Sequence, residues 1–119
     1  MSTRTNILIK TPEQTIYLYR HCDGYPEVTG RNLKEIINKK HWDCCDLATY
    51  LIQCHERFKW NSEDYYPYEL TYCIHGDIEF LYVIEILKDA TKLTAYAVHG
   101  FDRCAEDIIK PENIVDIPE

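Results

Sequence analysis

The sequence predicts a single α+β domain in which two helices cover one face of a five-stranded antiparallel sheet, in the order β-β-α-α-β-β-β. Segments rich in β-branched and aromatic residues predict the strands, at residues 6–10, 15–21, 69–75, 78–87 and 92–98. Between the second and third segments, apolar residues recur at helical spacing. Strands grouped on either side of a helical region are typical of sheets with helices on one face. A length of 119 residues suits one domain, so we expect residues 1–119 to share one core.

The first two strands are predicted to form a hairpin. Residues 11–14, Thr-Pro-Glu-Gln, supply a four-residue loop between them. In the second strand Ile16 and Leu18 take one face, while Tyr17, Tyr19 and His21 take the other, because successive side chains of a strand alternate. The aliphatic face is expected to face the core.

Two helices are predicted between the hairpin and the third strand. Leu33, Ile36 and Ile37 mark the first, which ends near two lysines at 39–40 whose charge suits a helix C-terminus. The second is expected to begin at Asp43, a good N-cap, and to carry an apolar stripe through residues 44–55. This stripe is predicted to pack on the sheet.

The last three strands are predicted to form a meander. Gly76-Asp77 suits a tight two-residue turn, and residues 88–91 suit a four-residue loop. The strand at 78–87 is the longest and most apolar, so we place it centrally. From about residue 102 the chain is expected to form a short helical piece through Ile109, broken by Pro111, and to end as an irregular acidic tail.

Charge narrows the classes of partner. The formal charge is −7, from 13 basic and 20 acidic side chains, whereas proteins that bind the phosphate backbone non-specifically need clustered lysine and arginine. The acidic tail is either a solvated surface or a face for a basic partner. No apolar run approaches the roughly 20 residues that span a membrane. We therefore predict neither non-specific nucleic-acid binding nor membrane insertion.

The six cysteines predict a reduced environment. They form no C-x-x-C motif, and the first ten residues are too polar for a secretory signal. We expect most of them to be small buried apolar groups, and we expect no structural zinc. The predicted location is the cytoplasm.

Two segments share the order His-x-Asp and supply the candidate ligand-binding residues. One lies at residues 21–27 and the other at 75–79, and the candidates are His21, Asp23, Tyr25, His75, Asp77 and Glu79. Three interpretations are open. The residues cap two unrelated turns, they hydrogen-bond a polar ligand with His21 as a potential base, or they bind a divalent metal that activates water. The metal interpretation needs an extended 75–79 segment, whereas Gly76-Asp77 favours a turn.

The loop at residues 60–68 supplies the candidate partner-binding residues, Tyr65, Tyr66 and Tyr68. Aromatic side chains on a loop are common in surfaces that grip a partner or stack on a base. They also fold back over a core, and the sequence does not choose between the two. Ten tyrosines in the chain favour first a sheet and then a binding surface.

Three further segments carry a signature: residues 1–7, Tyr-Leu-Tyr-Arg-His at 17–21 leading into Asp-Gly-Tyr-Pro-Glu at 23–27, and residues 68–71 followed by 74–82 with its His-Gly-Asp-x-Glu segment. In these segments the sequence resembles a family of small uncharacterised proteins from bacteriophages, prophages and plasmids. The resemblance covers residues 1 to about 87, and Cys22 occupies the variable position of the signature. It implies a small accessory protein of a mobile element, located in the cytoplasm of a host cell, and carries no catalytic assignment.

These observations lead to three functional hypotheses. The first is an accessory that antagonises a host defence by binding a host protein or a nucleotide signal, without a cofactor. The second is a small metal-dependent hydrolase of a nucleotide or phosphodiester. The third is a structural interaction module without a catalytic site. A homodimer is a further possibility if the tyrosine-bearing sheet face is left uncovered.

Overall fold

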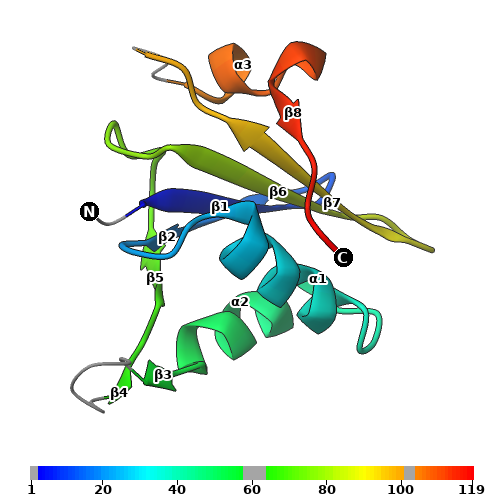
Figure 1. The fold of residues 1–119 in the computed structure, drawn as a ribbon. Helices are drawn as coiled ribbons and strands as arrows, with labels where there is room; N and C mark the ends of the chain where they lie inside the picture. The colour runs from blue at the N-terminus through cyan, green and yellow to red at the C-terminus, as the bar shows by residue number, and fades with distance from the viewer. Residues whose placement is uncertain (1–2, 58–63, 101–103) are drawn as a thin grey trace.

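The fold is α+β, with a mixed six-stranded sheet in the order β5-β2-β1-β6-β7-β8 (Figure 1). It was obtained as a computed structural model, which describes residues 3–57, 64–100 and 104–119. The sheet strands are β1 (Thr5–Lys10), β2 (Thr15–Arg20), β5 (Tyr68–Thr71), β6 (Phe80–Ile86), β7 (Thr91–Ala97) and β8 (Ile114–Val115). A separate small hairpin joins β3 (Glu56–Arg57) and β4 (Asp64–Tyr65). The helices are α1 (Arg31–Ile37), α2 (Cys44–Gln53) and α3 (Ala105–Ile108), with a π-helical turn at Pro26–Gly30 and a 3-10 turn at Pro111–Asn113.

The predicted five-stranded antiparallel sheet is wrong in strand number and in direction. β1 pairs with β2 in antiparallel fashion, as expected of the hairpin, but it pairs with β6 in parallel, with Thr5 opposite both Arg20 and Phe80. The predicted meander is correct for β6 and β7, which pair in antiparallel fashion, but wrong for β5, which pairs with β2 and not with β6. The turn at Gly76-Asp77 exists, but it lies within a crossover, residues 72–79, that leads from the β5 edge to the centre of the sheet.

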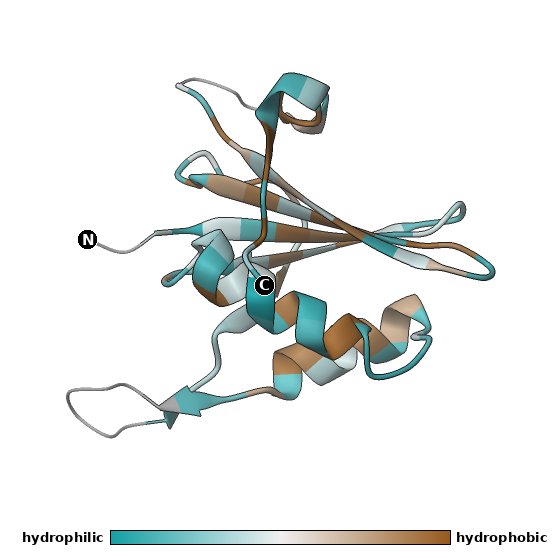
Figure 2. Cartoon of the chain, turned by 45° about the vertical axis from the view of Figure 1, so that its right-hand side comes forward, coloured by the Kyte–Doolittle hydropathy of each residue, from teal (hydrophilic) through white to brown (hydrophobic). Residues whose placement is uncertain are grey.

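One face of the sheet is covered by α1 and α2, as the sequence predicts (Figure 1). Asp43 caps α2, because its carboxylate accepts hydrogen bonds from the backbone N–H groups of Cys45 and Asp46. Leu47 and Leu51 of α2 pack with Leu18 of β2 in this helix-side core. In Figure 2 hydrophobic colour is common along the central strands of the sheet, whereas strands β3 and β4 are hydrophilic.

The opposite face is also buried. Leu8, Tyr19, Leu81 and Val83 form a second core there. The crossover contributes Ile78 to it, and α3 contributes Ile108. The uncovered tyrosine face that would have favoured a homodimer is therefore not present, since the crossover and α3 cover it.

The C-terminal tail is more ordered than expected. α3 confirms the short helical piece, but after Pro111 the chain forms β8, which pairs with β7. Ile117 then packs beside Gly30, where an added Cβ would lie 3.0 Å from the Ile117 side chain. Gly30 thus gives the tail room to lie against the helical region.

The burial of the cysteines differs from the prediction. All six cysteines are unpaired, but Cys44 is the one that is buried, while Cys45, Cys73 and Cys104 are exposed. The expectation that most are buried is therefore wrong. Among the described residues, no helix is long and apolar enough to cross a membrane.

Candidate functional site

The two predicted ligand segments meet at one end of the sheet. The first residues of the chain lie between them and hold both through backbone hydrogen bonds. The N–H of Gly24 donates to the carbonyl of Thr3 at 2.9 Å, and the N–H of Glu79 donates to the carbonyl of Arg4 at 2.8 Å. An added Cβ on Gly24 would approach the Thr3 carbonyl to 2.9 Å, so this close contact requires glycine.

Tyr19 is the side chain on which three of the predicted residues converge. Its hydroxyl donates to the Asp77 carboxylate at 2.9 Å. The His75 ring stacks on the Tyr19 ring at 3.9 Å between centroids, and the His21 ring meets its edge at 4.6 Å. The crossover causes this convergence, because it carries residues 75–77 over the face of β2 on which Tyr19 lies. We call these four residues the Tyr19 cluster.

Polar contacts extend the Tyr19 cluster towards the β5 edge. Nε2 of His21 lies 2.9 Å from the Glu69 carboxylate, and Nε2 of His75 lies 2.9 Å from the Thr71 hydroxyl. On the other side the Asp77 carboxylate forms an ion pair with Arg4 at 3.3 Å. Both imidazoles therefore contact side chains of β5, which is the edge strand of the sheet.

The electrostatics of Tyr19 make it a hydrogen-bond donor. Burial of its ring is the main cause that raises its pKa to about 12, and the hydrogen bond to Asp77 and the Asp77 charge add to the shift. At neutral pH the phenol stays protonated, and its hydroxyl donates a hydrogen bond to the Asp77 carboxylate. This arrangement stabilises the crossover and does not generate a phenolate nucleophile.

We expect Asp77→Asn to lower the pKa of Tyr19 while leaving it above the ordinary value of 10.0, because burial is the larger cause. Since the folded pKa is raised, the associated stability is complete below pH 10 and is lost as the pH rises to about 12. Nuclear magnetic resonance titration of ring-labelled tyrosine measures the shift. Asp89→Asn, in the exposed turn after β6, is the control and should leave it unchanged; an unchanged pKa in Asp77→Asn would contradict this account.

Asn6 anchors the crossover, a role that the sequence analysis does not predict. It is fully buried, and its amide nitrogen donates to the carbonyls of Leu18 at 2.9 Å and Cys73 at 3.2 Å. Its amide oxygen accepts from the backbone N–H of His75 at 2.8 Å. The Asn6 side chain, which belongs to β1, thus connects β2 to the two crossover residues that flank Ile74, namely Cys73 and His75.

Arg20 anchors the other segment and was also missed. Its side chain is 0% exposed and forms two hydrogen bonds with the Glu56 carboxylate, at 2.9 and 3.2 Å. Its Nε donates to the carbonyl of Cys22 at 2.6 Å, and its guanidinium lies over the Tyr68 ring. Burial opposes the charge, but the contacts with Tyr68 and Glu56 outweigh it and raise the pKa of Arg20. Arg20 therefore stays charged and fixes the chain as it leaves β2.

The other predicted ligand residues lie at the same end of the sheet without joining the Tyr19 cluster. Asp23 has a left-handed backbone (φ 58°), and its carbonyl accepts from the Thr29 hydroxyl at 2.6 Å. Tyr25 is partly exposed, with its ring tilted against Phe80. The hydrogen bonds of Glu79 come from its backbone. Among the described residues, none of the contacts of Tyr19 involves Asp23, Tyr25 or Glu79.

The three predicted partner-binding tyrosines have different environments. Tyr66 is 67% exposed. Tyr68 is 1% exposed, and its hydroxyl donates to Asn32 at 2.7 Å, so it belongs to the core and not to the surface. The Tyr65 hydroxyl donates to Glu56 at 3.0 Å and is half-buried in the Arg20 network. Part of the predicted loop, residues 60–63, lies outside the described residues.

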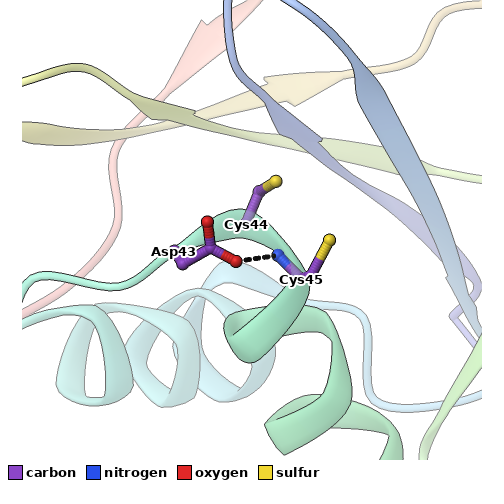
Figure 3. Close-up of side chains that lie close together, drawn as sticks. All are labelled: Asp43, Cys44 and Cys45. Carbon is purple, nitrogen blue, oxygen red and sulfur yellow. Dashed lines mark hydrogen bonds between the residues drawn. The ribbon is translucent and has the colours of Figure 1, made fainter.

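One group of potential metal ligands occurs in the described part of the chain. Ligand atoms of Asp43, Cys44 and Cys45 lie within 4.8 Å of one another at the start of α2 (Figure 3). The Asp43 carboxylate already caps the helix, and the thiol of Cys44 is buried beside the amide of Gln14, 3.0 Å away. Burial is the main cause that raises the pKa of Cys44. Metal binding at the two His-x-Asp segments stays a prediction.

A groove of about 340 Å³ lies away from these residues, between α1, β7 and the C-terminal tail. Lys34, Leu93 and Ile117 are among the residues that line it, and none of the six predicted ligand residues does so.

Comparison with known proteins adds no relative: no family model, no curated protein and no solved structure matches the chain.

Proposed function

We propose that the chain is a binding protein whose contact surface is the open edge of β5. The observation that carries the proposal is the exposure of large apolar side chains along this edge. Tyr66 is 67% exposed, Leu70 is 66% exposed and Tyr72 is 89% exposed. Leu70 lies in β5, Tyr72 directly follows the strand, and Tyr66 precedes it by two residues. Together with Glu69 of β5, these residues form what we call the β5 edge surface.

The backbone of β5 supports the same proposal. Within residues 3–57, 64–100 and 104–119, β5 is the last strand of the sheet and has one neighbouring strand, β2. Such an edge offers unpaired N–H and C=O groups to another chain, and natural proteins usually protect it with charge, proline or a covering segment. Here the edge carries exposed Leu70 and is followed by exposed Tyr72, which is the arrangement expected of a surface that another protein covers.

The Tyr19 cluster acts as the support behind the β5 edge surface. His21 contacts Glu69, and His75 contacts Thr71, so two of the predicted ligand residues hold alternate residues of β5 from one face of the sheet. On the other face, Tyr68 packs under Arg20. A strand fixed from both faces presents its outer edge in one conformation, which lowers the entropic cost of binding.

The wider biological role rests on the resemblance to proteins of mobile elements. On that basis we propose an accessory that antagonises a host defence, with a host protein as the partner. A nucleotide signal as the ligand, a metal-dependent hydrolase and a purely structural module are the alternatives, and no contact in the described structure favours them over protein binding. Tight divalent-metal binding that Asp77→Ala abolishes without loss of folding would favour the hydrolase.

The proposed function is tested with a paired-variant capture experiment. Wild-type protein, the double variant Leu70→Ser/Tyr72→Ser and the control Ile114→Ser are immobilised and exposed to a bacterial lysate. Ile114 is a matched control, because it is exposed on β8, the strand at the opposite edge of the sheet. Retained proteins are identified, purified and titrated against each variant by calorimetry.

We expect a partner that binds wild type and the β8 control alike and binds the double variant at least about tenfold more weakly. All three proteins should unfold at similar temperatures, because the substituted side chains are exposed. A partner set that is the same for the double variant and the wild type would contradict the proposal.

A further inference from the structure

The two faces of β5 differ in chemistry. Leu70 lies opposite Leu18, whose side chain is in the helix-side core, so Leu70 points to the helix side of the sheet. Glu69 lies opposite Tyr19 and points to the other side. A strand added beside β5 would therefore find an exposed aliphatic side chain on one face and a carboxylate on the other.

The carboxylate face is acidic. Glu69 and Asp77 are both about half exposed. The partner of Glu69 is His21, which is charged only when protonated. Arg20, the cation within the same strand pair, is buried and neutralised by Glu56. The Asp77 carboxylate is paired with the partly exposed Arg4, so the carboxylate of Glu69 is the negative charge that a chain approaching β5 meets on this face.

These facts disfavour a second copy of the chain as the occupant. Each copy carries a formal charge of −7, and two β5 strands side by side would bring their Glu69 carboxylates to the same face. A chain with basic side chains at the corresponding positions would instead be attracted.

We propose that β5 accepts an extended segment of a partner protein in which apolar and basic residues alternate, and that this segment extends the sheet as a seventh strand. Its apolar side chains pack beside Leu70 on the helix side, and its basic side chains lie beside Glu69 on the other. Main-chain hydrogen bonds supply affinity, and the alternation supplies specificity. This inference rests on the proposed function and names the chemistry of its partner.

The probe is a short capped peptide in which lysine and valine alternate. It is titrated against the full-length protein by calorimetry, at low and at high salt. Four comparison peptides accompany it. One has the same composition with lysines and valines in separate blocks, and one has glutamate in place of lysine. The other two form a pair, methylated at the backbone nitrogens of either every lysine or every valine. N-methylation of alternate residues removes the N–H groups from one edge of a strand, so each member of the pair leaves one edge intact.

We expect the alternating peptide to bind, to weaken with salt, and to bind at least about tenfold more tightly than the block and glutamate peptides. One member of the methylated pair should lose binding, while the other retains it. Glu69→Lys should abolish the preference for lysine over glutamate, and Ile114→Ser should leave binding unchanged. Equal binding of both methylated peptides would overturn strand addition, and equal binding of the glutamate peptide would overturn the charge assignment.

Two further outcomes separate this inference from the proposed function. If no peptide binds while a captured partner still depends on Leu70 and Tyr72, the strand chemistry is wrong and the binding surface stands. If neither peptide nor partner depends on the β5 edge surface, both fail. Self-association of the wild type in sedimentation, abolished by Leu70→Ser/Tyr72→Ser, would assign the edge to a second copy and overturn the inference.

Discussion

Glu56→Ala is expected to lower the free energy of unfolding by about 3 kcal/mol, because it leaves the fully buried guanidinium of Arg20 without its counter-charge. Glu56 also accepts the Tyr65 hydroxyl, so the β3–β4 hairpin loses a contact in the same variant. Urea denaturation followed by circular dichroism measures the change. A loss within about 1 kcal/mol would mean that the pair behaves as a surface ion pair.

The double variant Arg20→Met/Glu56→Ala is the informative control for this prediction. Removing both charges leaves neither buried without a partner, and an unbranched apolar chain fills much of the space of the arginine stem. We therefore expect the double variant to be more stable than Glu56→Ala alone. If the two losses simply add, the ion pair is not the origin of the effect.

Asn6→Leu is expected to destabilise the fold by roughly 2–4 kcal/mol. It leaves the Cys73 carbonyl and the His75 N–H without their partner, and each unsatisfied buried group costs about 1–3 kcal/mol. The crossover should loosen first, so hydrogen exchange at His75 should quicken more than at the strand β7. Asn38→Leu, at the exposed end of α1, is the control and should change stability by no more than about 0.5 kcal/mol.

Asn6→Asp separates hydrogen bonding from shape at the same position. A carboxylate there still accepts from His75 but faces the carbonyls of Leu18 and Cys73, so burial and repulsion raise its pKa in the folded state. A raised folded pKa gives a contribution that is present at low pH and is lost as the pH rises through that pKa. We expect the stability gap to wild type to narrow on acidification; a gap that does not change with pH would contradict the assigned contacts.

The sequence predicts the local parts of this fold well and its non-local parts poorly. The β1–β2 hairpin and the Asp43 cap of α2 are correct, because each depends on residues that are close in sequence. The meander is correct for β6 and β7 but wrong for β5, because Gly76-Asp77 signals a turn but contains no information about the strand that β5 pairs with. The parallel pairing of β1 with β6 has no local signature at all.

The same distinction applies to the candidate site. The His-x-Asp pattern correctly marks two segments that meet, and His21, His75 and Asp77 gather on one side chain. The strand period correctly places that side chain, Tyr19, on the same face as His21, but it does not predict that the other residues converge on Tyr19. A signal for Arg20 was present, because alternation places it on the same face as Leu18, where a charge needs a buried partner. The partner, Glu56, is 36 positions away and could not be inferred.

The parallel pairing of β1 with β6 determines when, during synthesis, the sheet can be completed. Thr5 contacts Phe80 across 75 positions of sequence, so one edge of β1 has no partner until the β6 residues have left the ribosome. The hairpin, both covering helices and β5 are made before that moment, yet the apolar side chains of β1 lie beside an open strand edge throughout. The last third of the chain thus decides when the nascent protein stops being prone to aggregation.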